Sequence, residues 1–279
     1  MVPVVVGPDV VVVDTCGTGG GELTTFNIST AAALVAAAGG AVIAKHGNRS
    51  FSSRCGSADV IEALGVRIEL SAEAMADVLA RAGIVFMFAP LLHPAMRHVA
   101  PVRRELGVPT IMNLLGPLTN PAGARRQVVG VSDPRLVTLV AGALRELGHS
   151  HALVVHGAPG IDELSPLGPT EGLELRDGEL HAFRIDPSSF GWSDFDHADL
   201  AGGGPAENAA LTRALLEGRG PPGARAAMLL NAAAALYVAG LVGSVGEGVE
   251  RAGWVVDEGK AAAKLAELVA ASGESGVRS

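Results

Sequence analysis

Short apolar segments alternate along the chain with longer segments in which apolar residues recur at helical spacing. Short β-branched runs are typical of buried strands, whereas longer periodic segments are typical of helices. The predicted strands are Val10–Asp14, Ala41–Ala44, Ile84–Phe88, Gln127–Val131 and Ala152–Val155. The predicted helices are Ala31–Ala38, Ala58–Leu64, 72–82, Ala95–Leu106, Pro134–Leu147, Pro205–Leu216, Ala224–Val238, Ser244–Val256 and Lys260–Ala271. This alternation predicts an α/β fold with a mainly parallel sheet flanked by helices.

Cap and turn residues mark the ends of several elements. Ser29 is the expected N-cap of the first helix, and Ser71 is the expected N-cap of the helix that stops at Gly83. Asp177-Gly178 is a strong hairpin signal between the strand-like segments Leu173–Arg176 and Glu179–Phe183. The tail from Ser272 onward is polar, and we expect it to be frayed.

Composition narrows the functional classes. Apolar residues make up 48% of the chain, enough for a sizeable core, yet no apolar run reaches the ~20 residues of a membrane span. The net charge of −8 and the lack of a basic stripe argue against a general nucleic-acid binder, but not against a protein that binds small anions. The only cysteines, Cys16 and Cys55, do not suggest a disulfide scaffold and suit a reducing cytoplasm.

A glycine-rich turn follows the first predicted strand. Gly17–Gly21 leads to Asn27–Thr30 at the start of the first predicted helix. Glycines let a backbone approach a ligand closely, so several amides and the positive end of the helix can bind one anion. The pattern is not the dinucleotide fingerprint, because no G-x-G-x-x-G opens the helix. A tight turn without a ligand is the alternative.

Three further segments carry chemistry. Lys45–Ser50, which continues to Ser52–Ser57, follows a strand end, where α/β folds bind ligands, and this favours a phosphate site over a solvated loop. His93–Arg104 has basic residues that either recognise a carboxylate or form an ordinary exposed face. Asp162-Glu163 is either a surface pair or a magnesium site, since Mg²⁺ takes one or two carboxylates plus substrate oxygens.

Together these segments resemble the anthranilate phosphoribosyltransferase family, from about Val10 to Val269. The most specific stretches are Lys45–Arg49, Ser53–Leu64, His93–Arg103 and Asn113–Pro121. The resemblance implies a large α/β domain of the nucleoside phosphorylase/phosphoribosyltransferase type joined to a small helical domain. We expect one phosphoribosyltransferase α/β domain over residues 1–279. About 93–107 would belong to an incomplete small helical subdomain, because the usual N-terminal helical segment is lacking.

The resemblance also implies an activity and a site. The chain would transfer the phosphoribosyl group of 5-phosphoribosyl-1-pyrophosphate to the amine of anthranilate, giving N-(5-phosphoribosyl)anthranilate and pyrophosphate in tryptophan biosynthesis. The expected residues for phosphoribosyl pyrophosphate are Gly17, Thr18, Gly20, Asn27, Ser29, Thr30, Lys45 and Ser57. Those expected for anthranilate are Gly17, His46, Asn48, His93, Arg103 and Pro117. Ser29, Asp162 and Glu163 would hold Mg²⁺, and Lys45 and Arg103 would be catalytic. Family members are usually cytoplasmic homodimers, and we expect no nucleic-acid or membrane partner.

One departure and two alternatives accompany the resemblance. Gly21 stands where the family usually has an aspartate, so we assign it no role in holding the ribose pyrophosphate. A pyrimidine-nucleoside phosphorylase, which is similar in fold, is one alternative, although Lys45–Ser50 and Leu115–Pro121 favour the anthranilate type. A non-catalytic or impaired homologue that kept the binding pocket is the other alternative.

Overall fold

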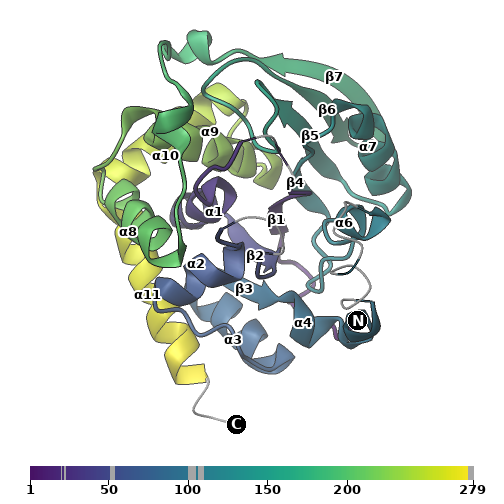
Figure 1. Ribbon diagram of the computed structural model, residues 1–279. Coiled ribbons are helices and arrows are strands. Elements are labelled where there is room, and N and C mark those ends of the chain that lie inside the picture. Colours follow the sequence, from purple (N-terminus) through teal and green to yellow (C-terminus); the bar gives the residue numbers. More distant parts are fainter. Residues whose placement is uncertain (20, 22, 51–53, 100–104, 106–109, 276–279) are drawn as a thin grey trace.

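A seven-stranded sheet forms the centre of the molecule (Figure 1). The computed structural model describes residues 1–279 except 20, 22, 51–53, 100–104, 106–109 and 276–279. The strands are β1 (Val12–Gly17), β2 (Val42–Gly47), β3 (Ile84–Phe88), β4 (Arg126–Gly130), β5 (His151–Gly157), β6 (Thr170–Arg176) and β7 (Glu179–Ile185). Their order is β3-β2-β1-β4-β5-β6-β7, in which β3 to β5 are parallel and β6 and β7 pair antiparallel. The predicted α/β fold with a mainly parallel sheet is confirmed.

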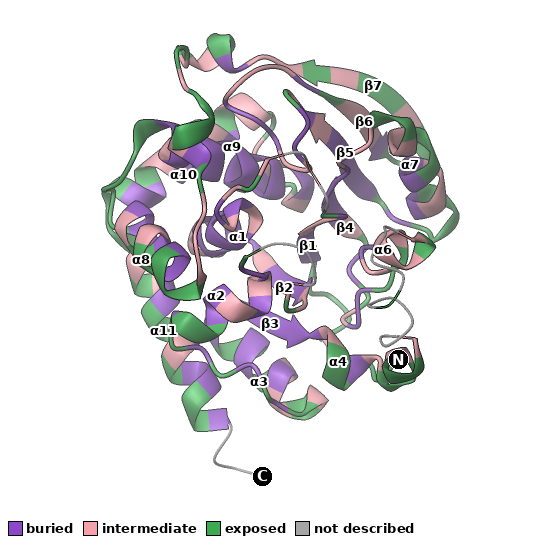
Figure 2. Cartoon of the chain, viewed as in Figure 1, coloured by how far each residue is buried: buried purple, intermediate pink, exposed green. Residues whose placement is uncertain are grey.

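Helices cover both faces of this sheet. Successive residues of a strand point to opposite faces, so each strand contributes side chains to the packing on both sides. Val128 and Leu153 belong to the large core shared with α1 and α9, whereas their neighbours Val129 and Val154 pack with residues of α7. The longer helices are α1 (Ile28–Ala38), α2 (Ser57–Ala63), α3 (Ala72–Ala82), α7 (Val137–Glu146), α8 (Pro205–Leu216), α9 (Pro222–Ala239), α10 (Val245–Asp257) and α11 (Lys260–Ser275). Short helices are α4 (Ala89–Leu92) and α6 (Ile111–Leu115). Figure 2 shows that buried residues concentrate in strands β1 to β5 and in helices α1 and α9, whereas β7 is mostly exposed or intermediate.

Several predicted ends are confirmed. Ser71 caps α3, because its hydroxyl accepts a hydrogen bond from the backbone nitrogen of Ala74 at 3.2 Å. Gly83 ends that helix in the left-handed conformation, with a φ of 69°. Asp177 and Gly178 have positive φ values of 52° and 87°, as a two-residue hairpin turn requires, and they join β6 to β7.

The predicted cap at Ser29 is wrong. Helix α1 begins at Ile28, and Asn27 occupies the N-cap position. Ser29 lies inside the first turn, where its backbone nitrogen donates to a carboxylate oxygen of Glu163 at 3.2 Å. This partner comes from a distant part of the chain, so local sequence carried no sign of it.

The prediction of a frayed tail from Ser272 is also wrong for the residues that the structure describes. Helix α11 continues to Ser275, and both serines are buried. The Ser272 hydroxyl accepts from the backbone nitrogen of Arg67 at 3.1 Å, and the Ser275 hydroxyl donates to Asp77 at 2.8 Å. These contacts fix the last turn of α11 against Arg67 and helix α3.

Two predicted helices differ in type where they begin. Pro94–His98 is a 3₁₀-helix, closed by bonds such as that from the Met96 nitrogen to the His93 oxygen. Most of the rest of the predicted helix Ala95–Leu106 lies outside the described residues. Pro134–Leu136 is likewise a 3₁₀ turn before α7. The assignment of residues 93–107 to a small helical subdomain stays a prediction. In the described part of the chain, no helix is long and apolar enough to cross a membrane.

Candidate active site

The carboxyl ends of four neighbouring parallel strands meet at one edge of the sheet. They are Gly47 of β2, Gly17 of β1, Gly130 of β4 and Gly157 of β5. Open α/β sheets bind ligands at this edge, because the loops that leave the strands converge there. The predicted glycine turn, the Lys45 loop and the Asp162-Glu163 loop follow β1, β2 and β5, so the topology brings them together.

Asp162 lies directly against the glycine turn. Its Oδ2 accepts a hydrogen bond from the backbone nitrogen of Gly19 at 2.7 Å. A Cβ atom on Gly17 would lie 2.2 Å from the same oxygen, and one on Gly130 would lie 1.7 Å from the backbone oxygen of Asp162. Glycine at the ends of β1 and β4 therefore makes room for the acidic loop.

Lys45, Ser29 and Glu163 form a second, continuous group. The Lys45 ammonium donates to the Ser29 hydroxyl at 3.2 Å and also to the backbone oxygen of Thr15. Glu163 Oε1 accepts from the backbone nitrogen of Ser29 at 3.2 Å. Lys45 is 4% exposed, so its charge acts in a medium that screens it weakly. The structure thus joins three residues predicted from three separate motifs.

Burial shapes the ionisation of this group. It raises the pKa of Glu163 to about 8, an effect that neighbouring Asp162 increases and Lys45 opposes. Burial likewise raises the pKa of Asp162. Burial lowers the pKa of Lys45, against the attraction of Asp14. Two adjacent, half-buried carboxylates lie here, of which Glu163 interacts with the Lys45 ammonium, and a divalent cation would relieve the repulsion between them.

The donor set fits magnesium. Asp162 and Glu163 offer carboxylate oxygens, and Ser29 offers a hydroxyl. Among the residues that the structure describes, no group of three or more His, Cys, Asp or Glu could hold a metal ion. The remaining ligands would be water and substrate oxygens, which is the usual manner of Mg²⁺ binding and differs from that of zinc.

The sequence did not predict the buried polar residues that contact β2 around Lys45 and His46. Asp14 is fully buried in β1, where one carboxylate oxygen accepts from the His46 backbone nitrogen at 3.2 Å and the other accepts from the Asn120 side chain at 2.8 Å. Asn120 also donates to the backbone oxygen of Ala44 at 2.9 Å. A charged residue directly after the valine run Val10–Val13 was the available signal.

His46 and His93, both predicted for anthranilate, are brought together. Their ring centroids are 4.9 Å apart, and both Nε2 atoms are buried without a hydrogen-bond partner among the described residues. Burial lowers the pKa of each ring to about 4, so both are neutral at pH 7. Pro117 lies in the same region, because His46 is hydrogen-bonded to the backbone of the preceding residue, Gly116. The Pro117 carbonyl accepts a hydrogen bond from the Gln127 side chain at 2.7 Å.

Asn48 and Ser57 are held beside each other across their loop. The Ser57 hydroxyl donates to the backbone oxygen of Asn48 at 3.3 Å.

The Asn27 amide has structural partners, because its nitrogen donates to Cys55 O at 3.2 Å and its oxygen accepts from Asn208 at 2.9 Å. Asn27 therefore ties helix α8 to the Lys45–Ser57 segment.

The other predicted site residues are placed less completely. Thr18 bonds the backbone nitrogen of Ser132 through its hydroxyl at 3.4 Å, which fastens the glycine turn to the end of β4. The Thr30 hydroxyl is buried and has no partner in the described part of the chain. Gly20 and Arg103 lie outside the described residues, so their roles stay predictions.

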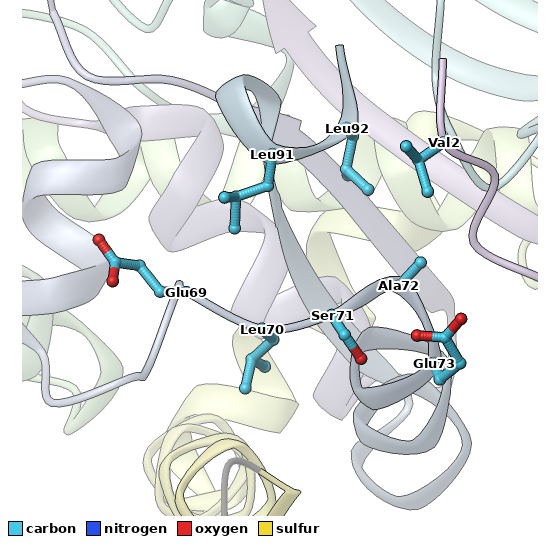
Figure 3. A pocket seen from close by; sticks show the side chains of 8 residues that line it. All are labelled: Val2, Glu69, Leu70, Ser71, Ala72, Glu73, Leu91 and Leu92. Carbon is cyan, nitrogen blue, oxygen red and sulfur yellow. The ribbon is translucent and has the colours of Figure 1, made fainter. Parts of the chain in front are cut away.

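A separate hollow of about 480 Å³ lies between the N-terminal segment, the start of α3 and helix α4 (Figure 3). Its lining combines apolar and acidic side chains and consists of Val2, Glu69, Leu70, Ser71, Ala72, Glu73, Leu91 and Leu92. None of these belongs to the predicted site. The candidate active site is therefore defined by its polar contacts and not by this hollow.

Comparison with known proteins agrees with this geometry. Residues 9–262 match the model of a glycosyl transferase family, a/b domain. The chain is 56% identical over 253 residues to anthranilate phosphoribosyltransferase 2 of Streptomyces coelicolor, which covers 90% of this chain and 75% of that protein. The chain belongs to the anthranilate phosphoribosyltransferase family. The chain is also 52% identical over 264 residues to the anthranilate phosphoribosyltransferase of Pelotomaculum thermopropionicum, a match that covers 94% of this chain and 76% of that protein.

Solved members of the family have the same fold. The crystal structure of anthranilate phosphoribosyltransferase from Thermus thermophilus superposes with a TM-score of 0.89 at 47% identity, covering 97% of this chain and 80% of that one. The Saccharomyces cerevisiae enzyme in complex with PRPP and Mg superposes with a TM-score of 0.86 at 29% identity, covering 96% of this chain and 75% of that one.

Proposed function

We propose that this chain transfers the phosphoribosyl group of 5-phosphoribosyl-1-pyrophosphate to the amine of anthranilate and releases pyrophosphate. One observation carries the proposal. The Lys45 ammonium, the Ser29 hydroxyl and the Glu163 carboxylate form one hydrogen-bonded group at the strand ends, beside the glycine turn. Such a group can bind and neutralise a pyrophosphate with its metal ion, and the curated relatives are named for this reaction.

Magnesium would be held by Asp162, Glu163 and Ser29, and when bound it supplies positive charge that stabilises the departing pyrophosphate. Lys45 adds a fixed charge to the same end of the site. The glycine turn and the positive end of α1 favour phosphate oxygens beside them, while the Gly19 and Ser29 backbone nitrogens hold the carboxylates of Asp162 and Glu163. Because these groups are already in place, catalysis consists mainly of positioning and charge neutralisation.

The acceptor substrate is assigned to the neighbouring group of His46, Asn48, His93 and Pro117, with Arg103 recognising its carboxylate. An aromatic amine is uncharged at neutral pH and needs no strong base to expose its lone pair. His46 therefore orients the acceptor and does not abstract a proton, in keeping with a ring whose pKa burial lowers to about 4. We further infer that the protein works in the cytoplasm as a homodimer.

A substrate comparison separates this proposal from its alternatives. We expect turnover with anthranilate and phosphoribosyl pyrophosphate, and none with a pyrimidine nucleoside and phosphate. The reverse result would identify a nucleoside phosphorylase. Calorimetric binding of phosphoribosyl pyrophosphate without any turnover would identify a non-catalytic homologue.

A further inference from the structure

The carboxylate of Asp59 joins the described residues 49–50, which follow β2, to Gly56, which precedes α2. Its Oδ2 accepts from the backbone nitrogen of Gly56 at 2.8 Å and from that of Ser50 at 3.4 Å. Its Oδ1 accepts from the Arg49 guanidinium at 2.9 Å. A helix cap needs only the bond to Gly56, so the bonds to Arg49 and Ser50 go beyond capping.

Arg49 extends this closure to the neighbouring strand. The same guanidinium nitrogen donates to Glu62 of α2 at 2.8 Å, and the group lies 5.6 Å from the ring centroid of Phe88, the last residue of β3. The Asp59 side chain is 20% exposed and that of Glu62 is 50% exposed. Water therefore screens the bond to Glu62 more than the bond to Asp59. The Asp59 carboxylate also accepts from two backbone nitrogens, so it is the partner that ties Arg49 to the backbone of residues 50 and 56.

Two predicted substrate residues lie on opposite sides of this closure. The Asn48 carbonyl accepts from the Ala58 backbone nitrogen at 3.2 Å and from the Ser57 hydroxyl at 3.3 Å. The backbones meet without room for a side chain, since a Cβ on Gly56 would lie 2.3 Å from Ser50 N. The separation between Asn48 and Ser57 thus depends on the contacts that join residues 48–50 to residues 56–59.

We propose that Asp59, acting through Arg49, is a positioning residue that holds Asn48 and Ser57 at the spacing needed to bind anthranilate and phosphoribosyl pyrophosphate together. The inference rests on the proposed function for its substrates. Asp59 touches neither substrate; it fixes the backbone from which Asn48 reaches the acceptor and Ser57 reaches the donor.

Asp59→Asn and Glu62→Gln form a matched pair, because each removes one carboxylate charge from the same guanidinium. An asparagine oxygen can still accept from Gly56, so the helix cap survives. We expect Asp59→Asn to raise KM for both substrates by at least about fivefold, the loss of one charge-assisted bond, while Glu62→Gln stays within about twofold. Arg49→Lys, which keeps the charge but loses the planar fork, should resemble Asp59→Asn. Unchanged KM values in a folded Asp59→Asn protein, or equal effects in Glu62→Gln, would overturn the proposal.

Amide hydrogen exchange tests the closure without relying on activity. We expect Asp59→Ala to speed exchange at Gly56 by at least about tenfold, while Glu62→Ala leaves it unchanged. Equal exchange in both variants and the wild type would overturn the closure itself. A wild-type protein without turnover would refute the proposed function, and the exchange result would still decide whether Asp59 holds the segment.

Discussion

Glu163 Oε1 accepts a hydrogen bond from the backbone nitrogen of Ser29 at 3.2 Å, although the two residues are 134 positions apart. The bond places a carboxylate at the positive end of helix α1, where the helix dipole favours negative charge. The Ser29 hydroxyl is at the same time bonded to Lys45. Ser29 therefore contacts both a predicted magnesium ligand and a predicted phosphate ligand. A change that displaces the Asp162-Glu163 loop should weaken the binding of Mg²⁺ and of phosphate.

Gly17→Ala tests how closely the acidic loop approaches the glycine turn. The new Cβ would lie 2.2 Å from Asp162 Oδ2, so the carboxylate must move and its bond to Gly19 is lost. We expect the Mg²⁺ concentration for half-maximal activity to rise at least about tenfold, the loss of one charge-assisted hydrogen bond. Gly142→Ala is the control, because its Cβ would meet nothing within 4 Å. An unchanged magnesium dependence would contradict the placement of Asp162.

Arg103→Lys tests recognition of the anthranilate carboxylate. Lysine keeps the charge but loses the planar fork that binds a carboxylate through two parallel bonds. We expect kcat/KM for anthranilate to fall by ~1–3 kcal/mol of transition-state stabilisation, with little change in KM for the other substrate. Steady-state kinetics in both substrates measure this, and a wild-type anthranilate profile would reject the assignment.

Gly21→Asp introduces the carboxylate that the family resemblance leads us to expect at this position. A Cβ at this position would lie 3.1 Å from the Gly160 backbone oxygen, a tight contact that a shift of a few tenths of an ångström relieves, and 3.9 Å from Asp162 Oδ1. The added charge would therefore join the predicted metal side of the site. We expect a lower KM for phosphoribosyl pyrophosphate in the presence of Mg²⁺. Gly21→Asn is the uncharged control, and a raised KM in Gly21→Asp alone would refute the expectation.

The two buried histidines should make folding stability depend on pH. Burial lowers the pKa of His46 and of His93 from 6.5 to about 4, so between these values the unfolded chain binds more protons than the folded one. Their contribution to stability is thus complete above pH 6.5 and is lost as the pH falls toward 4. The free energy of unfolding, measured with denaturant, should fall less between about pH 7.5 and 5 for His46→Gln than for the wild type. Parallel curves for the two proteins would contradict this account.

Local sequence was sufficient wherever local chemistry decides the conformation. Asp177-Gly178 predicted the β6–β7 turn because both positions need positive φ, and Ser71 predicted the start of α3 because its hydroxyl bonds a nitrogen three residues on. The strand alternation also placed the predicted loops at one sheet edge, since parallel strands end together.

Contacts between distant segments were beyond local sequence. The cap at Ser29 was wrong because α1 begins one residue earlier, at Ile28, and the Ser29 hydroxyl bonds Lys45 instead of the helix. The fraying at Ser272 was wrong because its hydroxyl bonds Arg67. The buried support from Asp14 and Asn120 was missed for the same reason, because the partners are 106 residues apart. The function could be predicted without these contacts, since the family resemblance needs no knowledge of them.

The most direct test of the central claim is a fluorescence assay of anthranilate consumption with phosphoribosyl pyrophosphate and Mg²⁺, run with and without a chelator. The account predicts that anthranilate is consumed, that N-(5-phosphoribosyl)anthranilate and pyrophosphate are formed in equal amounts, and that the chelator abolishes turnover until Mg²⁺ is restored. No product at high enzyme concentration and saturating substrates, or equal turnover with and without the chelator, would contradict it.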